Sequence, residues 1–530
     1  MSDVVARIGD NTWREQAMMP VFLGSCILPL MLIVATVLYP TFTAEFLRRA
    51  GEFYLAKFPH WILWSISFFL ICTMVVIVLP RIGELKLGLP EDRPQTSFFS
   101  WFSIIFGAGM GVGLLTWGVA EPLAGMQNNP DVIIGFSEAN SSQGIPSALK
   151  WTYAHWGLAG WAGYAIVGLA VAYTGHRQRL PLTIRTALLP IFGNAMKGSL
   201  GQFIDMVTVA VTLLCVVQIL GFALEELVFC IAITIDALWL LEADGGVKVG
   251  SKIGASIFIM LFAAASAISG LGRGVKWVSN ANMLMSITIL ALILMAGSFV
   301  DSINALFFSA SSYLRDLPIL LLKVWMADGT ETMGKLHAWQ SEWTMFHWTG
   351  WWLAFSPFIG IFLAKVSKGR TIRQYVFATV ILPAFLTMVW MSFAGGNAIW
   401  LELNGTANGE LIKAGTGQKI FSMVEYLFAG WPATIVSIVL VLLLITYLTT
   451  SIDSAIIVVN TVLGQESSRD NRRAVVGWTT VLIAVMILLI LLDGFSSIRS
   501  AMVVSAAPIS VLMSLLCVSL GVAIYKDENK

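Results

Sequence analysis

The sequence predicts an all-α integral membrane protein with twelve transmembrane helices. Hydrophobic residues fill 57% of the 530 positions and charged residues only 12%, about half the charge of an ordinary soluble domain. Apolar runs of about 20 residues, the length that crosses the hydrocarbon core, recur along the chain. They lie near residues 21–39, 61–80, 98–122, 149–174, 203–240, 252–271, 281–300, 343–366, 371–395, 431–459, 474–493 and 499–524.

Two segments need separate treatment. The run 203–240 is longer than one straight span requires, so we expect either one tilted helix or two helices broken near Gly221. The region 301–342, between spans seven and eight, begins with an amphipathic stretch. We expect this stretch to lie along the membrane interface rather than to cross it.

The distribution of Lys and Arg predicts the orientation. Loops on the side of the two termini collect most of the basic residues, including Arg177, Arg179 and Arg185 after span four and Lys365 and Lys368 after span eight. Basic loops stay on the cytoplasmic side of a membrane. Both termini are therefore predicted to be cytoplasmic, in a multi-pass protein of the cell (inner) membrane.

The composition also excludes several classes of protein. A net charge of +1 gives no reason to expect a nucleic-acid partner. The five cysteines lie in apolar segments without paired spacing, and the five histidines form no short ligand pattern, so neither disulfides nor metal sites are expected. Because no catalytic cluster of His, Asp and Glu is visible, we expect no enzyme and no organic cofactor.

Two groups of aromatic residues lie inside the apolar segments, one in span four and one in span eight. Each group occupies one helix face, and two such faces in contact would form a cage that attracts a quaternary ammonium group through cation–π interactions. The competing interpretation is an interfacial aromatic belt, which the depth of both groups disfavours. The predicted cage consists of Trp156, Trp161, Tyr164, Trp351, Trp352 and Phe355.

Span three carries alternating glycines at Gly107, Gly109, Gly111 and Gly113. Glycine destabilises a helix interior by about 1 kcal/mol, so one interpretation is a discontinuous helix whose free N–H groups bind an anionic substrate group. The other interpretation is close helix packing of the small-xxx-small kind. The spacing leaves both open.

Polar residues recur inside span ten. Thr450, Ser451 and Ser454 surround Asp453, and uncharged hard oxygens suit a sodium ion. The alternative is that the hydroxyls merely bond to carbonyls one turn earlier. Acidic residues inside spans are functional candidates by default. Besides Asp453, they are Asp205, Glu225 and Glu226.

The chain resembles the betaine/choline/carnitine transporter (BCCT) family over all twelve spans. The motifs are G-A-G-M-G-V-G at 107–113, H-W-G-L-A-G-W-A-G-Y-A at 155–165, V-S-N-A-N-M at 278–283, W-W-L-A-F-S-P-F at 351–358 and T-S-I-D-S at 450–454. The resemblance implies a secondary transporter with a five-plus-five inverted repeat, the fold of amino-acid sodium symporters. It also allows a homotrimer.

The resemblance divides the chain into five parts. Residues 1–97 hold the N-terminal tail and two peripheral helices, 98–300 the first repeat, 301–342 the interfacial helix and loop, 343–524 the second repeat, and 525–530 a short tail.

The resemblance also implies site residues. The six cage residues are joined as substrate contacts by Gly109, Met110, Gly111 and Gly113. The implied sodium ligands are Gly107, Met110, Tyr447, Thr450 and Ser451. A second sodium site would use Thr212 and Phe358, but Val216 stands where the family has a second threonine. Phe355 stands where the family usually has tryptophan.

The function that the resemblance implies is import of a betaine-type zwitterion, with a quaternary ammonium or sulfonium head, by sodium symport. Glycine betaine, dimethylsulfoniopropionate and carnitine belong to this class. The absence of an acid at Gly113 favours a zwitterion over choline. The alternatives of the same fold are a sodium-independent exchanger and a proton-coupled choline or carnitine carrier, for which Asp453, Glu225 and Glu226 are the candidate residues. Alternatives from other classes are a channel and a sensor that binds the ligand without transporting it.

Overall fold

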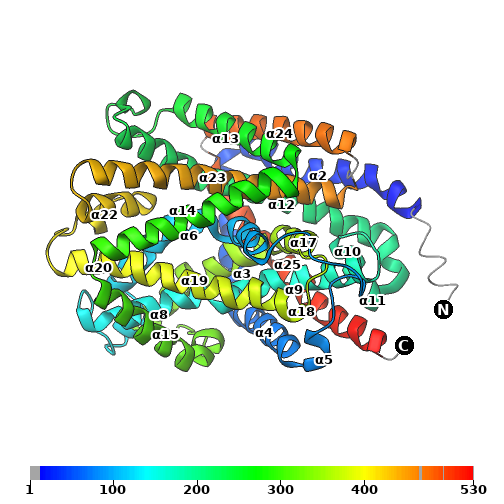
Figure 1. Cartoon of the computed structure of the whole chain (residues 1–530), viewed down its shortest axis with the longest axis horizontal. Coiled ribbons are helices and arrows are strands. Elements are labelled where there is room, and N and C mark those ends of the chain that lie inside the picture. Colours follow the sequence, from blue (N-terminus) through cyan, green and yellow to red (C-terminus); the bar gives the residue numbers. More distant parts are fainter. Residues whose placement is uncertain (1–11, 465–467, 493, 529–530) are drawn as a thin grey trace.

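The chain folds as a bundle of long helices (Figure 1). The computed structural model describes residues 12–464, 468–492 and 494–528, so residues 1–11 and 529–530 of the predicted tails lie outside the described residues. Within the described part, extended structure is limited to two isolated bridges, Lys86 with Thr371 and Leu241 with Val247. The membrane-protein fold class predicted from composition is confirmed.

The long helices follow the predicted apolar runs. In the first half they are α2 (Thr12–Leu38), α4 (Pro59–Val78), α6 (Phe98–Gln127), α8 (Ile145–Trp156) with α9 (Leu158–Ala172), α12 (Ser199–Thr234), α13 (Val249–Ser269) and α14 (Lys276–Ala296). In the second half they are α15 (Phe299–Leu322), α16 (Glu331–Trp339) with α17 (Ala354–Val366), α18 (Ile372–Val376) with α19 (Leu382–Trp390) and α20 (Gly396–Leu403), α23 (Trp431–Val462), α24 (Ser468–Leu491) and α25 (Phe495–Glu528).

Shorter helices and π-helical segments complete the chain. The short helices are α3 (Pro40–Lys57), α5 (Pro80–Gly83), α7 (Pro130–Ile133), α10 (Ile184–Ala187), α11 (Leu189–Phe192), α21 (Glu410–Lys413) and α22 (Lys419–Leu427). The π-helical segments are η2 (Tyr173–Arg177), η5 (Leu271–Val275), η6 (Gln340–Met345), η7 (His347–Leu353), η8 (Phe377–Ile381) and η9 (Met391–Gly395).

The long fifth run is one helix, α12, without a break at Gly221. A side chain at Gly221 would collide with the ring of Phe495. Gly221 therefore serves close packing between α12 and α25, and the helix stays intact.

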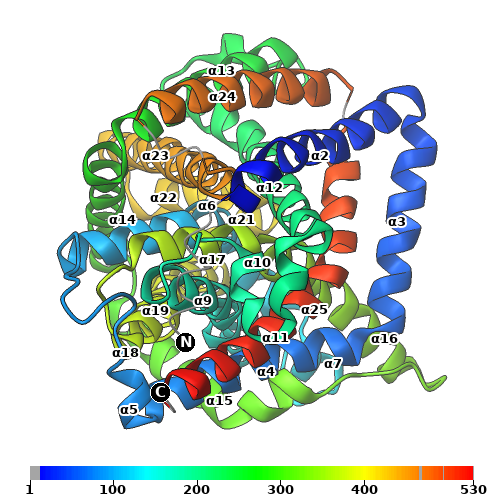
Figure 2. The same ribbon diagram turned by 90° about the vertical axis from the view of Figure 1, so that its right-hand side faces the viewer.

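Helix contacts repeat between spans three to seven and spans eight to twelve. In the first repeat, α6 packs against α14, and α14 packs against α23. The counterparts of α6, α14 and α23 are α17, α25 and α12. They pack in the same way, since α17 packs against α25 and α25 packs against α12. With α15 at the interface, as predicted, counterparts are five spans apart and cross the membrane in opposite directions. This is the predicted inverted repeat, and Figure 2 shows α6, α9, α12 and α17 at its centre.

Thirteen described helices are long and apolar enough to span a membrane, one more than predicted. The additional helix is α15, and Figure 1 places it at the end of the molecule away from both termini. Since the two termini lie at the same end, the number of crossings must be even. This supports the predicted interfacial position of α15, which stays a prediction.

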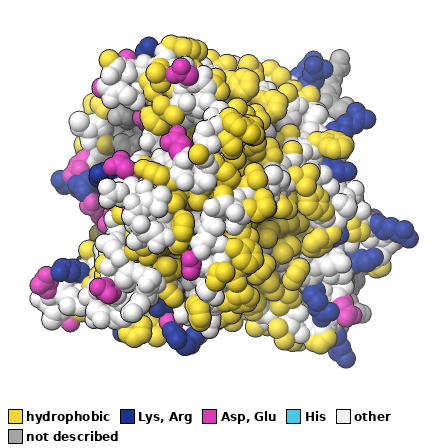
Figure 3. All heavy atoms as spheres, turned by 60° about the vertical axis from the view of Figure 1, so that its left-hand side comes forward, with side chains coloured by type: hydrophobic (Ala, Val, Ile, Leu, Met, Phe, Trp, Pro, Cys, Tyr) yellow, Lys and Arg dark blue, Asp and Glu magenta, His cyan; other side chains and the backbone are white. Residues whose placement is uncertain are grey.

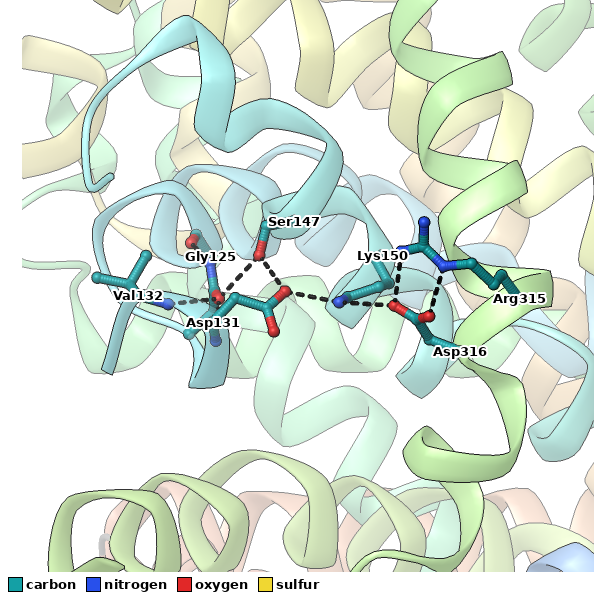
Figure 4. Close-up of polar contacts among 8 residues, drawn as sticks. Gly125, Asp131, Val132, Ser147, Lys150, Arg315 and Asp316 are labelled. Carbon is teal, nitrogen blue, oxygen red and sulfur yellow. Dashed lines mark hydrogen bonds and ion pairs between the residues drawn. The ribbon is translucent and has the colours of Figure 1, made fainter. Parts of the chain in front are cut away.

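An ion-pair network holds α15 on α8 (Figure 4). The ammonium of Lys150 lies 2.6 Å from Asp131 and 3.1 Å from Asp316. Arg315 also pairs with Asp316, at 2.8 Å, and the Ser147 hydroxyl donates to Asp131 at 2.6 Å. The Lys150 side chain is only 7% exposed, and a buried ammonium needs such partners. The network therefore fixes α15 to the core.

Candidate functional site

The two aromatic groups predicted from the sequence meet where α9 packs against α17. Trp156 ends α8, and Trp161 and Tyr164 follow in α9. Trp351 and Trp352 lie in η7, and Phe355 lies in the first turn of α17. A side chain at Gly160 would overlap the indole of Trp352, so this glycine lets the two helices approach closely enough for the rings to touch.

Trp352 lies at the centre of these aromatic rings. Its ring centroid is 4.8 Å from that of Tyr164, 5.7 Å from Trp161 and 6.0 Å from Trp156. Trp351 lies 5.7 Å from Trp156 and stacks on Phe355 at 5.2 Å. The structure therefore brings all six predicted residues into one continuous set of rings, which we call the aromatic box.

Part of the aromatic box is built on π-helical backbone. The segment η7, which carries Trp351 and Trp352, has a wider turn than an α-helix, and such segments recur at functional sites. Backbone polar groups inside a membrane must all find hydrogen-bond partners. The Gln218 amide of α12 donates to the Gly350 carbonyl at 3.0 Å, so α12 stabilises the irregular segment.

The structure contradicts one of the two interpretations of the glycine run. The helix α6 continues without interruption from Phe98 to Gln127, so its N–H groups are used within the helix. The expectation of a broken helix with free N–H groups at 109–113 is wrong for this structure. The close-packing interpretation holds, because an added side chain would meet the Trp161 ring at Gly109, the Tyr447 ring at Gly111 and the Trp351 and Trp156 rings at Gly113.

Among the expected sodium ligands, Gly107 and Thr450 lie face to face. A Cβ placed on Gly107 would lie 3.5 Å from the Thr450 hydroxyl oxygen and 3.9 Å from that of Ser279. Asn282 of α14 donates to the Thr450 oxygen at 3.3 Å, and Thr450 donates to the Tyr447 carbonyl at 3.0 Å. Bonding of the Thr450 hydroxyl to the preceding turn therefore occurs here too.

The side chains around Gly107 and Thr450 include oxygens that lack hydrogen-bond partners. Within the described residues, Ser279 Oγ and Asn282 Oδ1 are buried and make no hydrogen bond. Hard, uncharged oxygens of this kind fit a sodium ion. Ser279 and Asn282 belong to the V-S-N-A-N-M motif, which the sequence analysis used only as a mark of resemblance. The remaining expected ligands, Met110 and Ser451, are buried close by in α6 and α23.

The second sodium site gains no support from its neighbours. Thr212 donates its hydroxyl to the Thr208 carbonyl at 2.7 Å. Val216 and Phe358 are both buried and apolar. Thr212 thus makes the ordinary bond to the preceding turn.

The acids singled out from the sequence have separate surroundings. Asp453 accepts from Ser266 at 2.5 Å, and Glu226 accepts from Thr116 at 3.0 Å. Asp205 pairs with Arg185 at 2.8 Å, whereas Glu225 is exposed.

A cluster that the sequence analysis missed lies beside the aromatic box. Glu121 Oε1 is 2.5 Å from His155 Nδ1, and Glu121 Oε2 is 3.3 Å from His347 Nε2. The indole N–H of Trp156 donates to Oε2 at 2.5 Å. No short sequence pattern marks this cluster, because only the packing of three spans brings its residues together. The detectable signal was a His-Trp pair in each box-bearing span, at 155–156 and at 347–348.

By distance alone, Glu121, His155 and His347 could hold a metal ion, since their ligand atoms all lie within 4.8 Å of one another. The ring geometry opposes this. The two imidazoles are stacked with centroids 4.7 Å apart and planes inclined by only 8°. A metal bonds in the plane of each imidazole, and one ion cannot lie in two parallel planes. The cluster therefore fits shared protons better than a metal.

Comparisons with known proteins agree with a transporter of many membrane spans. A family model described as the betaine/carnitine/choline family transporter, BCCT, matches residues 20–529. A glycine betaine transporter of Bacillus subtilis is 30% identical over 485 residues, which cover 91% of this chain and 90% of the relative. A glycine betaine/proline/choline/ectoine transporter of Vibrio parahaemolyticus is 30% identical over 516 residues, with coverage of 96% and 87%.

The structure of a Na+-coupled sialic acid symporter in a substrate-bound outward-open state aligns with 86% of this chain and 85% of its own, at 12% identity and a TM-score of 0.46. This likeness is too distant to decide the coupling ion. The family match covers nearly the whole chain, and its members are transporters rather than enzymes. The chain belongs to the betaine/carnitine/choline family of secondary transporters.

Proposed function

We propose that the protein imports a betaine-type zwitterion, with a quaternary ammonium or sulfonium head, by sodium symport. The observation that carries the proposal is the aromatic box, in which six rings from spans four and eight form one surface. Each desolvated cation–π contact contributes about 2 kcal/mol. Several together bind a methylated cation without an acidic partner.

Unpaired donors in the aromatic box favour a zwitterion over a simple cation. Within the described residues, Trp161 Nε1, Tyr164 Oη and Trp351 Nε1 are buried without a hydrogen-bond partner. A buried donor without an acceptor destabilises a site by about 1–3 kcal/mol. A substrate carboxylate supplies acceptors, whereas choline has no carboxylate. We assign to these donors the role first expected of the N–H groups of Gly109, Met110, Gly111 and Gly113. Of these four, Gly109 and Gly113 face rings of the aromatic box, whereas Gly111 faces Tyr447.

Sodium is the proposed coupling ion, and its site is the oxygen group around Gly107 and Thr450. Ser279 Oγ and Asn282 Oδ1 lack partners there. The backbone of α6 contributes to both sites, since Gly107 faces Thr450 and Gly113 faces Trp351. Binding of either ligand therefore favours the same arrangement of α6, which couples the two binding equilibria.

We place both termini in the cytoplasm of a cell whose inner membrane holds the protein. Figure 3 shows an apolar band between two charged rims, and the rim on the side of the termini carries mainly Lys and Arg. That charge bias supports the cytoplasmic orientation. Assembly as a homotrimer stays a proposal from the family alone.

The decisive experiment is uptake into proteoliposomes. Labelled glycine betaine, dimethylsulfoniopropionate and choline are supplied with an inward sodium gradient, with equal sodium on both sides, and with potassium in its place. We expect accumulation above equilibrium only with the gradient, and with the two zwitterions preferred. Uptake indifferent to sodium but accelerated by preloaded substrate would contradict symport and establish an exchanger. Downhill equilibration under all conditions would establish a channel.

The aromatic box has its own test within the same assay. Trp352→Ala removes the central ring and is expected to abolish uptake, while Trp351→Leu keeps apolar volume and removes only one π-face. The control is Trp325→Ala, since Trp325 packs against Trp151 with ring centroids 5.6 Å apart, outside the aromatic box. Equal losses in Trp352→Ala and Trp325→Ala would contradict the assignment.

A further inference from the structure

We propose that Glu121, His155 and His347 form a proton-binding site whose proton holds Trp156 in place in the aromatic box. The inference rests on the proposed function for its effect on substrate, but the proton site itself follows from hydrogen-bond geometry. All three side chains are nearly fully buried, at 3%, 1% and 4% exposure. They come from three spans, α6, α8 and η7.

The partners of His347 require a proton on both of its ring nitrogens. Its Nδ1 lies 2.6 Å from the Trp343 carbonyl oxygen, and a carbonyl only accepts, so Nδ1 must donate. Its Nε2 lies 3.3 Å from Glu121 Oε2, an oxygen that already accepts from Trp156. A neutral His347 would turn its lone pair toward this carboxylate. The arrangement is favourable when Nε2 also carries a proton.

His155 needs no additional proton. Its Nδ1 donates to Glu121 Oε1, and its Nε2 lies 3.0 Å from the Thr344 hydroxyl, which can donate to it. Glu121 thus accepts from His155, His347 and Trp156, and three donors favour the ionised form of a carboxyl group. The cluster therefore consists of one carboxylate, one neutral imidazole and one imidazolium, with a net charge of zero.

Other charged groups on the surrounding helices do not supply this balancing charge. Within the described residues, Glu121 lies within ion-pair distance of His155 and His347. Charged side chains on the packed elements have partners of their own. They are Glu226 with Thr116, Lys150 with Asp131 and Asp316, Asp453 with Ser266, and Arg499 over the ring of Phe346 with Glu342 as its ionic neighbour.

The cluster is joined to the aromatic box at two points. Trp156 donates its indole N–H to Glu121, and its ring meets that of His347 edge-on at 5.3 Å. Trp352, the central ring, donates to the backbone carbonyl of His155 at 2.8 Å. Loss of the proton leaves a net negative charge in a buried site and sets the His347 lone pair against Glu121. The repulsion moves Glu121 and His347 apart. This movement displaces Trp156, and the affinity for substrate falls.

The first test needs no substrate. Protein labelled with ¹⁵N-histidine is examined by NMR from pH 6 to pH 9, as wild type and as His347→Gln, which can still donate to Glu121 but cannot titrate. We expect an imidazolium signal in the wild type that is missing in the variant. Glu121→Gln, which removes the charge that holds the proton, should also lose the signal. A wild-type His347 that is neutral throughout this range would overturn the proposal.

The second test measures the dissociation constant of glycine betaine at each pH in detergent, without any gradient. In the wild type we expect it to rise about tenfold per pH unit once the proton is lost, and to be nearly constant in His347→Gln. His337→Gln is the matched control, because His337 bonds to the Trp325 carbonyl outside the cluster, and should follow the wild type. An unchanged slope in His347→Gln would overturn the coupling. If the wild type binds no zwitterion at any pH, the proposed function fails, while the NMR result still decides the proton site.

Discussion

At the scale of single residues, the phenol of Tyr164 tests what the aromatic box recognises. Its ring lies 4.8 Å from Trp352, and its hydroxyl is buried without a partner among the described residues. Tyr164→Phe keeps the ring and removes the donor. We expect it to weaken glycine betaine binding by about tenfold, the equivalent of about 1.4 kcal/mol. Binding of tetramethylammonium, which has no carboxylate, should be unchanged, and equal losses for both ligands would contradict the role.

The hydroxyl of Ser279 tests the proposed sodium site in the same way. It is buried and unpaired near Gly107 and Thr450, and Ser279→Ala removes one oxygen with little change in volume. We expect the half-saturating sodium concentration for uptake to rise several-fold, while the maximal rate at saturating sodium is retained. Ser505→Ala is the control, because Ser505 bonds to its own helix at the Met502 carbonyl. Sodium dependence identical to wild type in Ser279→Ala would remove Ser279 from the site.

The residues of the aromatic box could be predicted from the sequence, and those of the cluster behind it could not. Trp351, Trp352 and Phe355 lie close together on one helix, so local spacing was enough. Glu121, His155 and His347 lie on three different spans, and no local pattern relates residues that only tertiary packing unites. The unpaired oxygens of Ser279 and Asn282 were hidden for the same reason.

At the scale of helices, an alanine at Gly111 tests whether steric overlap outweighs the higher helix propensity of alanine. Alanine is better than glycine in a helix by about 1 kcal/mol, but a Cβ at Gly111 would overlap the ring of Tyr447, whose hydroxyl is held by Ser286 at 2.8 Å. Overpacking of this kind destabilises by about 1–3 kcal/mol, so Gly111→Ala should lower the thermal midpoint. Gly254→Ala in α13, where nothing lies within 4 Å, should leave it unchanged or raise it. A midpoint raised equally in both variants would show that α6 and α23 are not packed as described.

The neighbours of these glycines explain why the glycine run alone could not distinguish a broken helix from a closely packed one. Alternating glycines are compatible with a broken helix and with a closely packed one, and the choice depends on what faces them. In this structure Trp161, Tyr447 and Trp351 fill the space that side chains would take. In span eight, which carries half of the aromatic box, irregular backbone occurs instead in η6 and η7, where bulky aromatic residues gave no sequence signal for a π-helix.

At the scale of the whole molecule, hydropathy alone predicted the fold class, because burial in lipid requires long apolar helices whatever their partners. Hydropathy could not decide whether α15 crosses the membrane, since its length and composition suit a span as well as an interfacial helix. Its fixed contact with α8 through Lys150 and Asp316 depends on charges that a search for apolar runs ignores. The number of crossings therefore needs a test of topology.

Cysteine accessibility provides that test. Asp301 and Asp328 are exposed residues before and after the core of α15, and Asn194 is an exposed residue in the loop after span four. In intact cells, a membrane-impermeant maleimide should label Asp301→Cys and Asp328→Cys and should spare Asn194→Cys until the membrane is permeabilised. The same variants in a cysteine-free background exclude reaction at the five native cysteines. Labelling of only one of the two positions around α15 would mean that α15 crosses the membrane, and labelling of Asn194→Cys in intact cells would reverse the proposed orientation.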